Sequence, residues 1–365
     1  MMIFNSNTNQ PQAPKVPLEG DLGGSTPKVR IEGTCLPLAG LGDFHSETPP
    51  LGGWGVPISV SSLTKSYDKG SVLAVKNVSF SVNKGEIFGL IGPDGAGKTS
   101  IFRTLTTLLL PDSGTAQVLG YDVVKDFRQI RNEVGYMPGR FSLYPDLSVE
   151  ENLKFYATIF GTTIEENFHL IRDIYVQIEP FKKRKSGKLS GGMKQKLALC
   201  CALIHKPKVL FLDEPTTGID PVSRKELWEM LLKLKEENIS ILVSTPYMDE
   251  AVRCDRIALI QQGEIMKTDT PQAIVDQYDK PLYAVGADDT YHLLKALEQY
   301  PERINSYAFG EFAHVVTTGT ETHLYEFLNN KGLKNITIKA VKATVEDCFI
   351  DLSIGHKSVI TAPEK

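Results

Sequence analysis

The chain lacks several features that would assign it to particular classes of protein. No apolar run approaches the roughly 18–20 residues that a helix needs to cross a bilayer, so any membrane-spanning step is expected to belong to another chain. The opening residues contain no basic stretch followed by an apolar core, so a signal peptide is not expected. A formal net charge of −4 gives no general attraction to nucleic acid, and no nucleic-acid partner is expected.

Cysteine is scarce and scattered. The five cysteines lie at positions 35, 200, 201, 254 and 348, without a CxxC spacing or a His/Cys cluster that would indicate zinc. Their odd number gives no disulfide framework, which fits a reducing cytoplasm. Cys200 and Cys201 fall in an apolar helical stretch and are interpreted as buried small hydrophobic residues. The one short basic run, Lys182–Lys185, is interpreted as a solvated face rather than a binding patch.

Composition and periodicity divide the chain into three regions. Residues 1–56 are rich in Pro, Gly, Ser, Thr and Asn without a sustained period, which predicts a poorly ordered tail, with a docking segment for a partner as the alternative. Residues 57–280 show globular patterning. Residues 281–365 follow the order strand–helix–strand–strand–helix–strand and then a closing helix, which predicts a small ferredoxin-like α+β accessory domain.

The central region predicts an α/β domain. Residues 58–67 and 72–82 alternate apolar and polar side chains, as half-buried antiparallel strands do. Later apolar runs alternate with helical segments, which favours a mostly parallel sheet. These runs lie at 86–91, 209–212, 239–244 and 256–260, and the helical segments at 221–237 and 248–253. Residues 149–181 are mostly helical in pattern and predict a lobe inserted into the sheet domain.

The stretch GPDGAGKTS fits the phosphate-loop pattern GxxxxGK[ST] between a predicted strand and a predicted helix. Its glycines allow backbone N–H groups to face phosphates, and the helix that follows adds its positive N-terminus. Lys98 is expected to reach the β- and γ-phosphates, and Thr99 to coordinate Mg²⁺. The alternative is a tight strand–helix turn without a ligand. The residues expected to contact ATP here are Gly92, Pro93, Asp94, Gly95, Ala96, Gly97, Lys98, Thr99 and Ser100.

A second stretch, VLFLDEP, supplies carboxylates at the end of an apolar run. Asp213 is placed to hold Mg²⁺ through water, and Glu214 to polarise the attacking water in a phosphoryl transfer. The alternative is an ordinary buried strand with a polar end. The following TTGIDP makes that alternative hard to hold.

A third stretch, LSGGMKQ, opens a helix with Ser190 as its N-cap, and Gly191 and Gly192 allow a phosphate to approach the backbone closely. By itself SGG could be a flexible loop. As a phosphate-binding device it points away from its own phosphate loop, so it needs a second copy of the domain. A dimer is therefore expected.

Together these motifs resemble the nucleotide-binding domain of ABC transporters over residues of about 58–280. The matching stretches, in order, are GPDGAGKTS, GYMPGRFSLYPDLSVEEN, LSGGMKQ, VLFLDEP, TGIDP and ILVSTPYMDEA. The resemblance implies that Tyr67 stacks on adenine. The closing VEDCFIDL is most similar to ATPase subunits of multidrug-type exporters, which pair with separate membrane subunits and often carry a small C-terminal α+β domain.

The chain departs from the family at two positions. After GYMP the family has glutamine and this chain has Gly139; after ILVST the family has histidine and this chain has Pro246. Neither side chain can donate or accept a hydrogen bond, so slow hydrolysis with intact ATP binding is expected. The alternative is that Arg140 or a nearby polar group substitutes and hydrolysis is normal.

The resulting hypothesis is an ATP-hydrolysing exporter subunit at the cytoplasmic face of the cell membrane. Its expected partners are transmembrane permease subunits and a second ATPase chain, identical or different, and its expected cofactor is Mg²⁺. A largely non-hydrolysing regulatory partner of another ATPase is the alternative. A soluble ABC protein of ribosome or DNA-repair type is disfavoured, because only one set of motifs is present and no long coiled-coil insertion separates the phosphate loop from LSGGMKQ.

Overall fold

The computed structural model describes residues 55–360, so nearly all of the predicted tail lies outside the described residues. The larger part of the described chain is built on a six-stranded sheet in the order β10-β9-β3-β8-β7-β6. Five strands are parallel and β10 is antiparallel to β9. The strands are β3 (Ile87–Ile91), β6 (Val134–Met137), β7 (Val209–Asp213), β8 (Ser240–Thr245), β9 (Arg256–Gln261) and β10 (Glu264–Asp269). The predicted mostly parallel sheet is confirmed.

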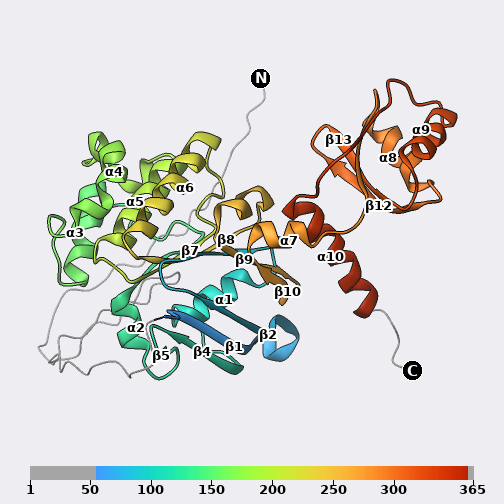
Figure 1. Cartoon of the computed structure of the whole chain (residues 1–365). Helices are drawn as coiled ribbons and strands as arrows, with labels where there is room; N and C mark the ends of the chain where they lie inside the picture. The colour runs from blue at the N-terminus through green and yellow to red at the C-terminus, as the bar shows by residue number, and fades with distance from the viewer. Residues whose placement is uncertain (1–54, 361–365) are drawn as a thin grey trace, which may run out of the picture. The chain divides into compact units, whose positions relative to one another are not determined.

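The central strands β3, β7 and β8 are buried along their whole length because both faces of the sheet are covered. Alternate residues of β3 point to opposite faces: Phe88 and Leu90 belong to one hydrophobic cluster, and Ile87 and Ile91 to another. The first cluster also contains residues of α1 (Lys98–Leu105) and of an antiparallel sheet, and Figure 1 shows α1 between the two sheets. The second contains residues of the helices on the opposite face.

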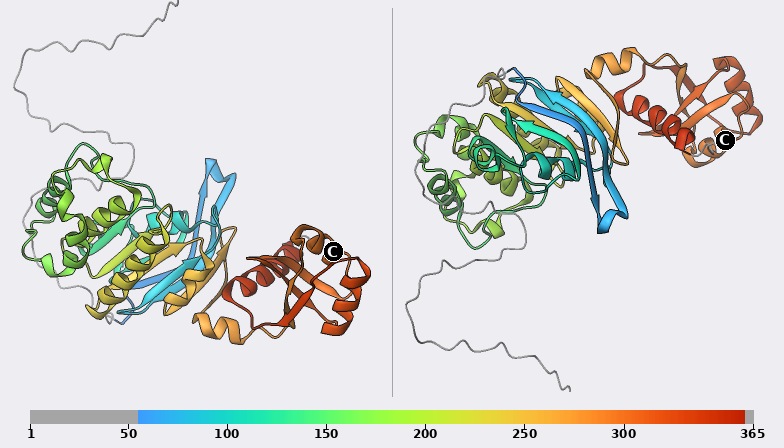
Figure 2. Two further views of the ribbon diagram at one scale, coloured as in Figure 1. Left: turned by 90° about the horizontal axis from the view of Figure 1, so that it is seen from above. Right: turned by 90° about the horizontal axis from the view of Figure 1, so that it is seen from below.

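The antiparallel sheet has four strands in the order β2-β1-β4-β5 and is drawn in blue to teal in Figure 2. The predicted strands at 58–67 and 72–82 are confirmed as β1 (Ile58–Tyr67) and β2 (Val72–Val82), whereas β4 (Ser113–Val118) and β5 (Tyr121–Asp122) were not predicted. In β4 only two of the six residues are buried, so the apolar alternation that marks a strand is weak. The 3₁₀ turn η1 (Asp68–Gly70) joins β1 to β2.

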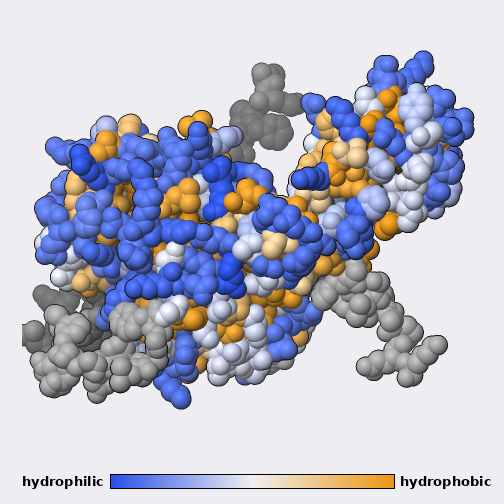
Figure 3. Space-filling model, in the orientation of Figure 1, coloured by the Kyte–Doolittle hydropathy of each residue, from blue (hydrophilic) through white to orange (hydrophobic). Residues whose placement is uncertain are grey.

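The predicted helical lobe is present as several shorter helices. Within the predicted range they are α3 (Val149–Ile159), α4 (Phe168–Ile178) and the 3₁₀ turn η2 (Glu179–Phe181). The 3₁₀ turn η3 (Ser186–Lys188) and α5 (Gly191–Leu203), the helix predicted to follow Ser190, come after it. Ser148 and Glu151 form a reciprocal capping box that starts α3. The buried Ile171 and Ile174 of α4 lie in one cluster with Leu197 of α5, while hydrophilic residues predominate on the outside of the lobe in Figure 3.

The remaining helices of this part connect the strands. They are α2 (Phe127–Glu133), α6 (Pro221–Glu236), η4 (Met248–Arg253) and α7 (Pro271–Asp276). Asp220 caps α6 and Pro221 occupies its first turn, where a missing N–H costs nothing. The segment predicted as a helix at 248–253 is a 3₁₀ helix. Among residues 55–360, no helix is both long and apolar enough to span a bilayer.

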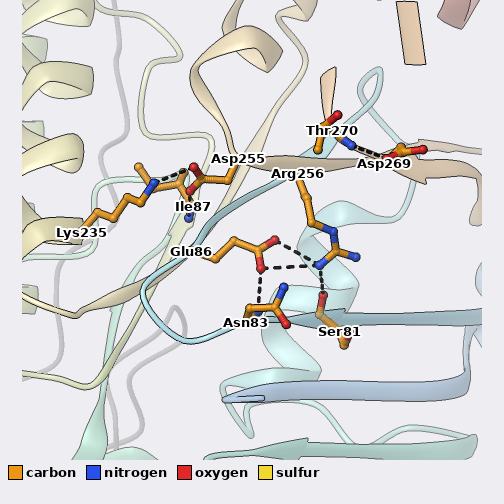
Figure 4. Close-up of polar contacts among 9 residues, drawn as sticks. All are labelled: Ser81, Asn83, Glu86, Ile87, Lys235, Asp255, Arg256, Asp269 and Thr270. Carbon is orange, nitrogen blue, oxygen red and sulfur yellow. Dashed lines mark hydrogen bonds and ion pairs between the residues drawn. The ribbon is translucent and has the colours of Figure 1, made fainter. Parts of the chain in front are cut away.

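A polar network fixes the start of β3, the strand that leads into the phosphate loop. Arg256 of β9 donates to Glu86 Oε1 at 3.2 Å and to the Ser81 carbonyl at 3.3 Å, which joins the six-stranded sheet to the end of β2 (Figure 4). Asp255 accepts the N–H of Ile87 at 2.9 Å and the Lys235 ammonium of α6 at 2.6 Å. Glu86 is 6% exposed, so its charge is held by Arg256 rather than by water.

The C-terminal region forms a four-stranded antiparallel sheet in the order β12-β13-β11-β14, with two helices in the connections. Its elements are β11 (Leu282–Gly286), α8 (Thr290–Glu298), β12 (Arg303–Phe309), β13 (Phe312–Thr317), α9 (Glu321–Asn330) and β14 (Thr337–Ala340). This is the predicted ferredoxin-like order. The predicted boundary after residue 280 stays a prediction; it falls between α7 and β11. The closing helix, predicted at 344–352, is longer: α10 spans Val345–Ile360.

Asp347 of α10 is a buried carboxylate that ties α10 to the C-terminal sheet. It is fully buried, and its Oδ1 accepts from Tyr307 Oη of β12 and from His314 Nδ1 of β13, each at 2.6 Å. Its Oδ2 accepts from the backbone N–H and the hydroxyl of Thr344, each at 2.7 Å. Burial by itself raises the pKa of Asp347, but these hydrogen bonds more than offset it, and the pKa lies below its ordinary value.

The lowered pKa fixes the sign of a pH dependence. Ionised Asp347 contributes stability that is present above about pH 4, the ordinary range of an aspartate, and is lost as the pH falls below it. We expect Asp347→Asn to lower the free energy of unfolding at pH 7 by about 1–3 kcal/mol and to flatten its decline between pH 5 and pH 3. Urea unfolding at several pH values measures both effects. The control Asp289→Asn keeps an exposed N-cap and should change little; equal acid sensitivity of Asp347→Asn and the parent would contradict the assignment.

Candidate nucleotide-binding site

The phosphate loop links β3 to α1 and is closely surrounded by backbone. Gly95 and Gly97 have φ of 78° and 100°, a region that favours glycine. A Cβ on Gly92 would lie 2.1 Å from the carbonyl oxygen of Ile260, and one on Gly97 would lie 2.2 Å from that of Ala74. The predicted glycines are therefore required by space as well as by conformation. Within the described residues no side chain caps the N-terminus of α1, which leaves this positive end for a ligand.

Lys98 lies inside the loop. It is 3% exposed, and its Nζ donates to the carbonyl oxygens of Gly92 at 2.7 Å and Pro93 at 3.0 Å. The same Nζ lies 3.3 Å from Glu214 Oε1. The structure thus brings together the lysine and the carboxylate that the sequence places far apart, and Lys98 is positioned between the loop and the end of β7.

Asp213 and Glu214 end β7 next to Ser244 of β8. Asp213 is 2% exposed, and its Oδ1 accepts from Ser244 Oγ at 2.7 Å. Burial raises the pKa of Asp213, partly opposed by hydrogen bonds from Ser244 and Thr99. Glu214 has φ of 52°, and its N–H donates to Ser244 Oγ at 2.9 Å and to the Ser244 carbonyl at 3.1 Å.

The residues at this point fit Mg²⁺. Thr99 and Asp213 lie within hydrogen-bonding range of one another and offer a hydroxyl and a carboxylate, the hard oxygen donors that Mg²⁺ prefers. A buried carboxylate with a raised pKa would be stabilised in its ionised form by a divalent cation. The two residues named from the sequence are therefore together in space.

The helix end formed by LSGGMKQ is open to solvent. Ser190 is exposed and caps α5 by accepting the N–H of Met193 at 3.4 Å. Gly191 is exposed, and a Cβ on Gly192 would lie 3.0 Å from Ser223 Oγ of α6. The capped N-terminus therefore faces outward, as a surface that completes the site of another molecule would.

Tyr67 lies at the end of β1 against the first turn of α1. Its side chain is half-buried, and its hydroxyl is 2.9 Å from Ser100 Oγ. This contact places the ring beside the phosphate loop and limits its rotation. Its expected stacking on adenine stays a prediction.

The two departures from the family border the carboxylates. A Cβ on Gly139 would lie 3.0 Å from the carbonyl oxygen of Asp213 and 3.7 Å from Glu214 Cβ, so a side chain here would reach the end of β7. Pro246 directly follows β8 and is half-buried. The next residue, Tyr247, lies under the guanidinium of Arg224, with 4.2 Å between Arg224 Cζ and the ring centre.

Three neighbours of the site were not predicted. Ser244 contacts both carboxylate residues; Thr217 Oγ1 donates to Glu214 Oε2 at 3.4 Å; and Thr216 Oγ1 donates to the buried Glu250 Oε2 at 3.0 Å. In the sequence, Ser244 is marked only by its position at the end of an apolar run, as Asp213 is at the end of VLFLD. Only the register, which pairs Asp213 with Ser244, turns that position into a contact.

Comparisons with known proteins agree with this geometry. A profile of the family described as ABC transporter matches residues 75–217. The chain is 37% identical over 303 residues to the "Probable multidrug ABC transporter ATP-binding protein YbhF" of Escherichia coli K12, which covers 82% of this chain and 52% of that one. It is 32% identical over 302 residues to "Nod factor export ATP-binding protein I" of Mesorhizobium japonicum, covering 82% of this chain and 87% of the relative.

Solved structures show the same likeness. A structure described as the ATP-binding subunit of an ABC transporter superposes with a TM-score of 0.55 at 27% identity, covering 60% of this chain and 92% of that one. The dimeric structure of MJ0796, a bacterial ABC transporter cassette, gives 0.54 at 26% identity, covering 58% and 98%.

The fold and the site define an ABC-type ATP-binding cassette of the P-loop NTPase class. The chain belongs to the ATP-binding proteins of ABC transporters, a family of ATPases. It spans about half the length of the E. coli relative.

Substitution of the buried Lys98 tests nucleotide binding directly. We expect Lys98→Met to lower the affinity for Mg·ATP roughly 30-fold or more, because a charge-assisted hydrogen bond contributes about 2 kcal/mol. Isothermal titration calorimetry measures the affinity. The control Lys154→Met removes a lysine of an exposed ion pair on α3 and should bind as the parent does. Undiminished affinity of Lys98→Met would contradict the site.

Proposed function

We propose that this chain is the ATP-hydrolysing subunit of an ABC exporter and acts on separate transmembrane permease subunits. The relative named for Nod factor export supports the direction of transport, and the relative named as a multidrug ABC transporter protein supports a role in transport. A place at the cytoplasmic face of the cell membrane follows from that role. The transported substrate would contact the permease.

One observation carries the proposal: Lys98, Asp213 and Glu214 meet in one chain, while the Ser190 helix end faces outward. We propose that ATP lies between the loop Gly92–Ser100 of one chain and Ser190–Gly192 of a second ATPase chain. The dimeric form of the similar cassette MJ0796 supports this arrangement. Whether the second chain is identical or different is an outcome of the test below.

The contacts of the site suggest how ATP is handled. Lys98 exchanges its loop carbonyl partners for the β- and γ-phosphates, and Tyr67 stacks on adenine. Glu214, released from its ion pair with Lys98, accepts a hydrogen bond from the attacking water and polarises it. Thr99 and Asp213 would hold Mg²⁺, which neutralises phosphate charge when bound. The segment around Phe141–Leu147 then transmits the motion of dimer closure and reopening to the permease.

We further propose that this chain's own site hydrolyses ATP slowly. Gly139 borders the Asp213 carbonyl oxygen and Glu214 Cβ but has no side chain, and Pro246 cannot donate a hydrogen bond. The chain would bind ATP and lend its Ser190 helix to a stronger site on a different ATPase chain. Negligible ATP turnover by this chain even in the complex with a second ATPase would favour a regulatory role.

Restoring the two missing groups tests this proposal. The purified chain is expected to bind Mg·ATP and to hydrolyse it slowly, and Gly139→Gln with Pro246→His to raise kcat at least tenfold, because a transition-state donor contributes about 10²–10³ in rate. The control pair Gly139→Ala with Pro246→Ala introduces the same Cβ beside Asp213 without a functional group. Steady-state phosphate release measures the rate.

Two results would contradict slow hydrolysis. One is rapid turnover by the lone parent chain that Glu214→Gln abolishes. The other is a double restoration that is no faster than its alanine control. Adding a candidate second ATPase chain and measuring nucleotide-dependent association distinguishes a homodimer from a heterodimer.

A further inference from the structure

The backbone of Glu214 is held in a conformation that costs energy. Its φ of 52° lies in the left-handed region, where the Cβ of a residue other than glycine crowds its own backbone. Such a conformation persists only when its surroundings fix it, and it is often found at functional sites. What fixes Glu214 therefore decides where its carboxylate points.

Ser244 makes the contacts that fix it. The Glu214 N–H is shared between Ser244 Oγ at 2.9 Å and the Ser244 carbonyl oxygen at 3.1 Å. The same Oγ donates its proton to Asp213 Oδ1 at 2.7 Å. Ser244 is fully buried on β8, an inner strand of the six-stranded sheet, so one hydroxyl satisfies both groups without competition from water.

Few other contacts restrain Glu214 among the described residues. Its side chain meets the Lys98 ammonium at 3.3 Å and the Thr217 hydroxyl at 3.4 Å, and Lys98 is expected to turn to phosphate when ATP binds. Gly139 lies beside Glu214 but has no side chain; a Cβ on Gly139 would lie 3.7 Å from Glu214 Cβ. The Glu214 backbone also accepts the N–H of Thr217 at its carbonyl oxygen at 3.2 Å, and the contact with the Ser244 hydroxyl, at 2.9 Å, is the shortest of its backbone hydrogen bonds that the structure shows.

We infer that Ser244 is a positioning residue for ATP hydrolysis: its hydroxyl aims Glu214 by holding the Glu214 N–H while it is anchored on Asp213. The inference rests on the proposed function, in which Glu214 polarises the attacking water. Ser244 touches neither ATP nor water in this role; it acts through the backbone of Glu214. Gly139 and Pro246 supply no side-chain hydrogen bond that could share this task.

A pair of variants of equal shape separates this role from simple packing. Ser244→Thr and Ser244→Val add the same volume to β8 and differ only in the hydroxyl. We expect the Val variant to lower the single-turnover rate of ATP hydrolysis by tenfold to a hundredfold relative to Thr, since small displacements of a catalytic group have effects of this size. The affinity for Mg·ATP should differ less than threefold between the two.

Two further readouts report on positioning itself. Amide hydrogen exchange of the segment 209–217, measured on the full chain without nucleotide, should be at least tenfold faster at Glu214 in the Val variant than in the Thr variant. In the background that carries Gly139→Gln and Pro246→His, the rate penalty of Val should shrink, because the restored groups take over part of the orientation.

The outcomes distinguish this inference from the proposed function. If the parent chain fails to bind Mg·ATP, the proposed function is wrong. If it binds and hydrolyses ATP but Val and Thr have equal rates, or if affinity falls in step with rate, the role of Ser244 is overturned. If the parent binds without hydrolysing, equal exchange at Glu214 in the two variants overturns it.

Discussion

The register of β8 between β3 and β7 is the constraint on which the site depends. β8 pairs in parallel with both neighbours, so that Ile91 lies beside Thr245 and Asp213 beside Ser244. The N–H of Gly92 donates to the Thr245 carbonyl oxygen, and the N–H of Glu214 to that of Ser244. One strand end therefore sets the separation between the phosphate loop and the carboxylates. A shift of one residue would turn every side chain of β8 to the opposite face and separate the groups.

Much of this arrangement could be predicted from the sequence, because the signals are local. A few consecutive residues are enough to indicate the apolar strands and the glycine loop. The same holds for the helices α5 and α6. The strands β4 and β5 could not be found, since β4 is mostly exposed and β5 has two residues. Ser244 was missed for a different reason: its partners come from another strand, and only the pairing of β7 with β8 reveals them.

The C-terminal region shows the same division between local and distant signals. Its strand and helix order followed from periodicity alone, and the sheet has the expected arrangement. The role of Asp347 could not be predicted, because Tyr307 and His314 reach it from strands some distance away in the chain. The motif VEDCFIDL marks the place in the sequence, whereas the structure shows that its aspartate is a buried tie between α10 and the sheet.

The catalytic machinery is distributed unevenly over this chain. The residues of the candidate phosphate loop and both carboxylates are present, with Lys98 and Asp213 buried, while two positions that border the carboxylates carry glycine and proline. Under the proposed function, such a cassette would retain the free energy of nucleotide binding and lose part of the rate of cleavage. In that proposal the exposed helix end at Ser190 serves another cassette regardless of the rate at this chain's own site.

The contacts of Lys98 also bear on how tightly a nucleotide can bind. Its ammonium contacts two loop carbonyls and one carboxylate. A phosphate bound as proposed would have to displace these partners, so its affinity would be the difference between new and old contacts rather than the strength of the new ones. Under the proposed function, nucleotide binding is therefore an exchange of partners at Lys98 rather than the neutralisation of an unpaired buried charge.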